Sequence, residues 1–276
     1  MYVESFKVDG GLNIFMRSWR PSANPRGVVI VVHGFNSHSG YYLWAAEQLV
    51  AMGLAVHALD LHGRGKSEGE RFYVEKFQDY VSDVAAAVSL AKSRNPALPV
   101  FLLGHSAGGI VACLYTIEHQ FELSGLICES FAYQVPAPDF ALTVLKGLSH
   151  LAPHAHVLKL KNEDFSRDPK VVEAMNGDPL IAREVQPTQT VAELARADDR
   201  LRKEFPAISL PLLILHGTAD KAAKPSGSQF FYDSVGSKDK TLKFYDGHFH
   251  DLLNDTDKEV VMADIANWIG GRLPVA

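Results

Sequence analysis

The segment at residues 99–114 constrains the fold more than any other stretch of the chain. An apolar run after Pro99 is typical of a buried strand, and the apolar residues after Gly109 recur at helical spacing. Between them stands Gly-x-Ser-x-Gly, centred on Ser106. So tight a passage from strand to helix needs small residues two positions before and after the serine, and both are glycine. The pattern predicts a strained serine whose hydroxyl projects above the sheet, and a backbone N–H at Ala107 that is free to bind an anion. The alternative is a chance pattern in a glycine-containing loop.

Strands and helices alternate along most of the 276 residues, which predicts an α/β fold. The β-branched run at 27–34 is of the kind that parallel sheets bury on both faces. Alternating residues around Asp9-Gly10-Gly11 predict an antiparallel hairpin at the sheet edge. We therefore expect a mostly parallel sheet of about eight strands flanked by helices. The expected strands are 2–8, 12–20, 27–34, 54–59, 99–103, 123–128, 211–216 and 241–245, and the expected helices include 77–94, 226–235 and 257–269.

Residues 131–206 interrupt this alternation. Prolines punctuate the first part of the segment, and no strand-like run appears within it. Apolar residues at helical spacing predict one helix over 139–151 and a second over 188–205. We therefore divide the chain into a core, 1–130 and 207–276, and an insertion, 131–206.

The first helix of the insertion carries large apolar side chains on one face, among them Phe140, Leu145 and Leu148. A solvated insertion would not need so many, so these side chains either pack on the core or line a channel for an apolar group. A His-x-His pair follows at His154 and His156. No acidic or cysteine ligand stands at matching spacing, so we interpret these histidines as solvated. We predict neither a metal ion nor a cofactor.

The charge balance argues against two classes of partner. A formal net charge of −5 gives no electrostatic attraction to nucleic acid or to an anionic membrane. We find neither a secretory leader nor an apolar run long enough for a membrane helix, and we expect a cytoplasmic protein. Cys113 and Cys128 fall in a predicted helix and strand, so we expect buried thiols rather than a disulfide.

Three residue types that cooperate in nucleophilic catalysis fall where predicted strands end. A serine hydroxyl needs an imidazole to take its proton, and the imidazole needs a carboxylate to orient it. Ser106, Asp220 and the pair His248 and His250 each follow a strand, and the carboxyl ends of parallel strands gather at one edge. Their order is that of the α/β-hydrolases. Spacing does not separate the two histidines, and Asp246 is an alternative to Asp220 as the acid.

Six short motifs run through the chain in order. They are H-G-x-x-x-H-S-G-x-Y from His33, D-x-x-G-R-G-x-S-x-G from Asp60, G-H-S-A-G-G from Gly104, G-D-P-L from Gly177, H-G-T-A-D-K from His216 and Y-D-G-x-x-H from Tyr245. Together they resemble the motifs of the monoacylglycerol lipase and lysophospholipase-like α/β-hydrolases, and the match runs almost from end to end.

This resemblance implies an α/β-hydrolase fold in which the insertion is a helical cap over an acyl channel. It implies that Ser106 is the nucleophile, Asp220 the orienting acid and His250 the base. It also implies an oxyanion hole formed by the backbone N–H groups of Phe35 and Ala107. The expected activity is hydrolysis of monoacylglycerol-like or other small lipophilic monoesters through an acyl-enzyme. The expected partners are the small ester substrate and, through the cap, lipid surfaces.

The chain departs from the family in the first motif, where Ser37 and Tyr41 replace a frequent glutamate and arginine. We expect these two residues on the alcohol side of the substrate, with weaker recognition of glycerol and broad esterase activity. We expect Leu145 and Leu148 on the acyl side. Two alternatives are a carboxylesterase or lysophospholipase with no glycerol preference, and a ligand-binding homologue without catalysis.

Overall fold

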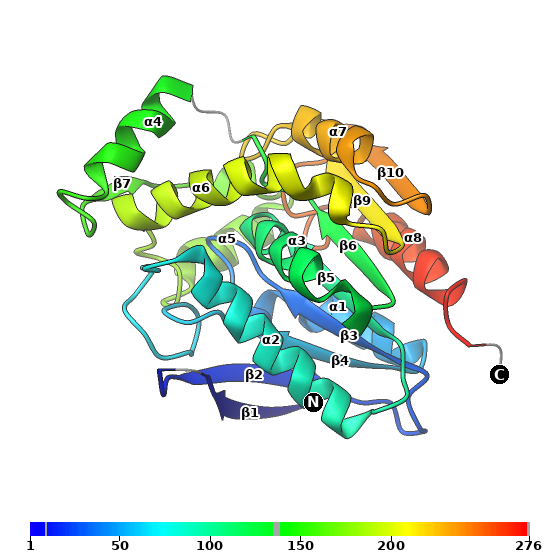
Figure 1. The fold of residues 1–276 in the computed structure, drawn as a ribbon. Coiled ribbons are helices and arrows are strands. Elements are labelled where there is room, and N and C mark those ends of the chain that lie inside the picture. Colours follow the sequence, from blue (N-terminus) through cyan, green and yellow to red (C-terminus); the bar gives the residue numbers. More distant parts are fainter. Residues whose placement is uncertain (9, 135–138, 275–276) are drawn as a thin grey trace.

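An eight-stranded sheet runs through the computed structural model, which describes residues 1–8, 10–134 and 139–274 (Figure 1). The strand order is β1-β2-β4-β3-β5-β6-β9-β10. The strands are β1 (Tyr2–Lys7), β2 (Asn13–Trp19), β3 (Gly27–Val32), β4 (Leu54–Leu59), β5 (Val100–His105), β6 (Gly125–Glu129), β9 (Leu212–Gly217) and β10 (Lys240–Tyr245). The β1–β2 hairpin and the β2–β4 pair are antiparallel, and every other pair is parallel. The expected fold class is confirmed.

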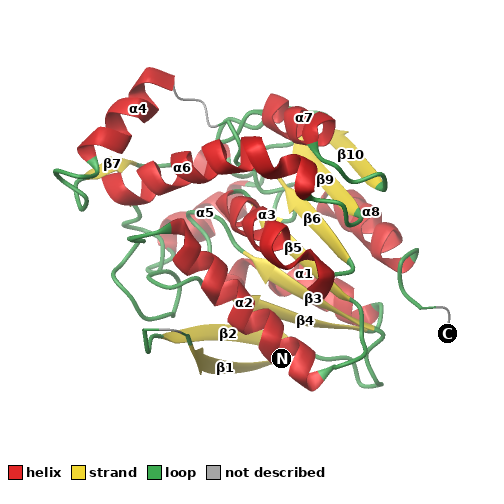
Figure 2. Ribbon diagram, viewed as in Figure 1, coloured by secondary structure: helices red, strands yellow, loops and turns green. Residues whose placement is uncertain are grey.

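Helices cover both faces of the sheet (Figure 2). The helices are α1 (Leu43–Ala51), α2 (Phe77–Arg94), α3 (Ala107–His119), α4 (Asp139–Leu148), α5 (Pro169–Gly177), α6 (Thr188–Glu204), α7 (Pro225–Ser234) and α8 (Lys258–Gly270). Apolar residues of α2, α3 and α6 share one buried cluster with the front of the sheet, and those of α1 and α8 share another with its back. Every residue of β3, β4, β5 and β9 is buried, which explains why these strands are continuous apolar runs.

The insertion differs in detail from the sequence prediction. The short strands β7 (His156–Leu158) and β8 (Gln186–Pro187) pair within it, so the expectation that it contains no strand is wrong. Helix α5 was not predicted, although Asp168 caps it and Pro169 occupies its first turn, which is a recognisable helix start. Helix α4 ends at Leu148, three residues earlier than expected. The side chain of Phe140 lies outside the described residues.

The two cysteines behave as predicted. Cys113 and Cys128 are buried free thiols, and their sulfur atoms lie 3.7 Å apart. Burial raises the pKa of the Cys113 thiol well above its ordinary value, which keeps the thiol protonated and unreactive.

Candidate active site

Ser106 occupies the sharp turn between β5 and α3. Its φ of 55° and ψ of −124° lie outside the helical and extended regions that L-residues prefer. A Cβ on Gly104 would lie 2.6 Å from the Gly108 carbonyl oxygen, and one on Gly108 would lie 2.3 Å from that of Val32. No real side chain fits at either position, so the two glycines allow the turn that presents the Ser106 hydroxyl.

A continuous chain of hydrogen bonds joins three of the residues singled out from the sequence. His250 Nε2 lies 2.8 Å from Ser106 Oγ, and His250 Nδ1 lies 2.7 Å from Asp220 Oδ2. The side chains of His250 and Asp220 are almost inaccessible to solvent, and Ser106 is 6% exposed. The arrangement suits the tautomer in which His250 Nδ1 carries the proton and donates it to Asp220, while Nε2 accepts from the Ser106 hydroxyl.

The carboxylate of Asp220 is held ionised by its surroundings. Burial raises its pKa, but the charge of His250, its hydrogen bond to Asp220 and the neighbouring His216 ring outweigh burial and hold the pKa well below its usual range. The other carboxylate oxygen accepts from the backbone N–H groups of Ala222 and Ala223, at 2.8 and 2.9 Å. His216 was not predicted to contact the acid, yet its Nε2 lies 2.9 Å from Asp220 Oδ2. Only its place in the H-G-T-A-D-K motif could have drawn attention to it.

The geometry also separates the alternatives that spacing left open. His248 Nδ1 lies 3.2 Å from the backbone carbonyl of Asp246, and no hydrogen bond within the described residues links His248 to Ser106 or Asp220. The Asp246 carboxylate accepts from the Thr218 hydroxyl at 3.0 Å. The structure therefore brings His250 and Asp220, rather than His248 and Asp246, to Ser106.

The loop after β3 lies directly against Ser106. A Cβ on Gly34 would lie 2.7 Å from Ser106 Cβ, so the two backbones are as close as glycine permits. Phe35 follows Gly34, and Ala107 begins α3 on the other side of the serine. Within the described part of the chain, neither the Phe35 nor the Ala107 backbone N–H has a hydrogen-bond partner. Two unpaired donors therefore flank the Ser106 turn.

Tyr41 and Ser37 occupy the same loop region. The Tyr41 hydroxyl donates to Asp178 Oδ2 at 3.1 Å, and His38 Nε2 lies 2.8 Å from the same oxygen. Asp178 belongs to the G-D-P-L motif of the insertion, so Tyr41 ties this loop to the insertion. Ser37 is buried at 3% exposure.

Leu145 and Leu148 lie on α4, at the outer end of the insertion (Figure 1). Leu148 is 38% exposed and Leu145 is partly buried. The neighbouring Val144 is 63% exposed, and Leu151 is 85% exposed. The apolar side chains at this end of the insertion are therefore only partly covered by the rest of the chain.

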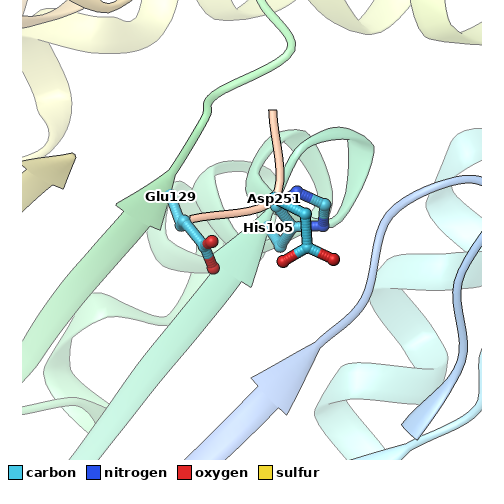
Figure 3. Close-up of side chains that lie close together, drawn as sticks. All are labelled: His105, Glu129 and Asp251. Atoms are coloured by element: carbon cyan, nitrogen blue, oxygen red, sulfur yellow. The ribbon is translucent and has the colours of Figure 1, made fainter. Parts of the chain in front are cut away.

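One group of described residues has the donor atoms for a metal ion, and Figure 3 shows it: His105, Glu129 and Asp251. All three are buried, and their ligand atoms lie within 4.8 Å of one another. Burial raises the pKa of Glu129 well above its ordinary value and lowers that of His105 well below. Both shifts favour uncharged side chains, so we interpret Glu129 as a buried acid that retains its proton and His105 as a neutral imidazole.

The fold and this geometry define an α/β-hydrolase, and comparison with known proteins agrees. The model of the family described as "Serine aminopeptidase, S33" matches residues 23–257, so the chain belongs to that family. It is 34% identical over 273 residues to the monoacylglycerol lipase of Mycolicibacterium smegmatis, covering 98% of this chain and 97% of that protein. It is 33% identical over 271 residues to the human monoglyceride lipase, covering 96% and 89%.

A solved structure agrees with these relatives. The crystal structure of the Paleococcus ferrophilus monoacylglycerol lipase superposes with a TM-score of 0.84 at 27% identity, covering 93% of this chain and 99% of that one. The chain is thus a monoacylglycerol lipase-like α/β-hydrolase, a hydrolase that acts on esters. In the described ranges, no helix is both long and apolar enough to cross a membrane.

Proposed function

We propose that Ser106, His250 and Asp220 are the nucleophile, the base and the orienting acid of a carboxylic ester hydrolase. The observation that carries the proposal is the unbroken hydrogen-bond chain from the Ser106 hydroxyl through His250 to Asp220. His250 takes the Ser106 proton as Oγ attacks the ester carbonyl, and then gives it to the leaving alcohol. Water activated by the same imidazole hydrolyses the acyl-enzyme and restores the serine.

The backbone N–H groups of Phe35 and Ala107 are the proposed donors to the oxyanion of each tetrahedral intermediate. Their positions on either side of Ser106 and their lack of other partners in the described residues support this role. A donor aimed at the developing charge lowers the barrier most when it is fixed beforehand.

The proposed substrates are monoacylglycerol-like or other small lipophilic monoesters, with broad rather than sharp alcohol selectivity. The monoacylglycerol and monoglyceride lipases described above support an acyl ester as the substrate. The engagement of Tyr41 with Asp178 supports the alcohol part, because a hydroxyl already bound to a carboxylate is less available to glycerol. Residues 131–206 would form the cap, with Leu145 and Leu148 beside the acyl chain. The exposed apolar residues of α4 would contact lipid surfaces. A cytoplasmic location stays a prediction.

The test of the proposed roles uses two pairs of variants. Ser106→Ala is expected to abolish turnover and labelling by a fluorophosphonate without unfolding the protein, whereas Ser37→Ala keeps the labelling. His250→Ala is expected to lose several orders of magnitude in kcat, whereas His248→Ala keeps most of it. Labelling at another serine, or a greater loss in the His248 variant, would contradict the assignment.

The proposed alcohol selectivity is tested with matched esters of one acyl chain. We expect kcat/KM for the monoacylglycerol to lie within about tenfold of that for the ethyl ester, after correction for leaving-group reactivity. A preference for the glyceride of about a hundredfold, or about 2.7 kcal/mol, would show that glycerol recognition is intact and that broad selectivity is wrong.

A further inference from the structure

Arg64 is a charged side chain in the interior, at the glycine-rich turn after β4. It is 1% exposed. Its guanidinium forms an ion pair with Glu184 of the insertion, which is 3% exposed. It also donates to the Tyr80 hydroxyl at 3.0 Å and to Gln186 Oε1 at 2.8 Å. These contacts use the guanidinium's fixed planar geometry, which a lysine could not reproduce.

The ion pair also contacts the loop that follows β3. Glu184 Oε1 accepts from the Asn36 backbone N–H at 2.9 Å. The Arg64 guanidinium carbon lies 4.2 Å from the centre of the Phe35 ring. Asn36 has a positive φ of 50°, in the left-handed region that asparagine adopts more readily than most residues. Arg64 therefore holds the ring of Phe35, while Glu184 holds the amide that follows it.

A buried ion pair contributes little net stability to the folded state. Two charges taken out of water lose hydration that their attraction does not fully restore, and apolar replacements of buried pairs are often neutral or stabilising. The position of the pair suggests another role. Phe35 stands between two fixed neighbours. The residue before it, Gly34, packs on Ser106, and the backbone N–H of the residue after it, Asn36, is bound by Glu184.

We propose that Arg64 and Glu184 are positioning residues that fix the direction of the Phe35 backbone N–H and so couple the insertion to the oxyanion hole. The inference rests on the proposed function, because it takes the Phe35 N–H as an oxyanion donor. A donor that loses this support points away from the oxyanion in part of the population. The loss then appears in the transition state rather than in binding of the ground-state ester.

The experiment measures kcat, KM and the affinity for an acyl trifluoromethyl ketone, which forms an oxyanion on Ser106. Glu184→Gln leaves a buried unpaired charge on Arg64, so the double variant Arg64→Met with Glu184→Gln removes both charges and keeps an amide oxygen for Asn36. In the single and the double variant we expect kcat and the ketone affinity to fall roughly ten- to a hundredfold. This loss is smaller than the loss of about a hundredfold or more that follows deletion of an oxyanion donor. KM should change less than about threefold.

Asp83→Asn is the matched control. Asp83 is equally buried. Its carboxylate accepts from the His62 backbone N–H at 2.9 Å and lies 2.8 Å from His62 Nδ1, in the same turn as Arg64. None of its hydrogen bonds in the described structure reaches the loop at 34–36. This variant should lower the melting temperature while kcat and ketone affinity stay within about threefold.

Three outcomes would overturn the inference. Unchanged kcat and ketone affinity in the double variant would show that the pair does not position the donor. If the double variant regained both the melting temperature and the kcat that Glu184→Gln loses, the pair would have only a structural role. Full turnover by Ser106→Ala would refute the proposed function itself, and the inference with it. An inactive Ser106→Ala beside a fully active double variant refutes the inference alone.

Discussion

The carboxyl group of Asp251 lies in the interior, 2% exposed, immediately after His250 and facing Glu129 (Figure 3). Burial raises its pKa from 3.8 to about 6, and the negative charge of Asp255 adds to the rise. A hydrogen bond from Asn254 and the charge of His250 oppose this rise without cancelling it. The folded protein therefore holds a proton on Asp251 at a pH where the unfolded chain has lost it.

The consequence is a defined loss of stability with rising pH. Since the folded state binds the proton more tightly, the free energy of unfolding falls as pH rises from about 4 through about 6. With a pKa of 3.8 in the unfolded chain and about 6 in the folded protein, the free energy of unfolding lies below its acid limit by about 3 kcal/mol at pH 8 and by about 1 kcal/mol at pH 4.5. Asp251→Asn is neutral at every pH and escapes this loss. Its stability relative to the wild type should therefore improve by about 2 kcal/mol between pH 4.5 and pH 8.

Urea unfolding followed by tryptophan fluorescence at pH 4.5, 6 and 8 measures this difference. Asp255→Asn is the control of opposite sign. Burial raises the pKa of Asp255, but hydrogen bonds from Phe249 and Arg167 outweigh it and hold the pKa below its usual range. Asp255 therefore contributes stability at pH 8 that is lost as pH falls, and its variant should be most destabilised at pH 8. A stability difference between Asp251→Asn and the wild type that is the same at all three pH values would refute the reasoning.

Three further predictions concern the active site and the insertion. Asp220→Asn should lower kcat roughly 10⁴-fold, because the imidazole loses its orienting partner, and a loss under tenfold would contradict the assigned role. Gly34→Ala would place a Cβ 2.7 Å from Ser106 Cβ and should lower kcat about a hundredfold or more, whereas Gly177→Ala, with nothing within 4 Å, should retain activity. Leu148→Asp should raise KM for long acyl chains more than for acetate; equal changes with a lower melting temperature would indicate a packing role.

Features set by local pattern were predictable from the sequence. Strand and helix periodicity gave the eight-stranded sheet, and glycines at fixed positions gave the turn around Ser106. The resemblance to the monoacylglycerol lipase family then favoured His250 over His248. Helix α5 was missed because it is short and only weakly apolar, although its Asp168-Pro169 start was readable. The contact between His216 and Asp220 was missed because a buried polar side chain in a strand has no signature of its own.

Contacts between distant segments were not predictable in the same way. Glu129 and Asp251 stand on different elements and read in the sequence as ordinary acids. Burial raises the pKa values of both, and the charge of Asp251 adds to the rise at Glu129. Arg64 and Glu184 are 120 residues apart, and no local pattern marks them as partners. Such pairs depend on the packed tertiary structure, which periodicity and motif spacing do not encode.

The same contacts change what the insertion means for catalysis. The sequence division at residue 131 suggests a cap that only covers the site, yet the insertion contacts the core beside the proposed triad. The ring of Phe165 meets that of His250 edge to face, with centres 4.9 Å apart, and its carbonyl accepts from the Asp251 N–H at 2.8 Å. Glu184 holds the Asn36 amide on the other side of the serine. Because the insertion orients both the histidine loop and the proposed oxyanion loop, changes within it should alter kcat as well as the choice of acyl chain.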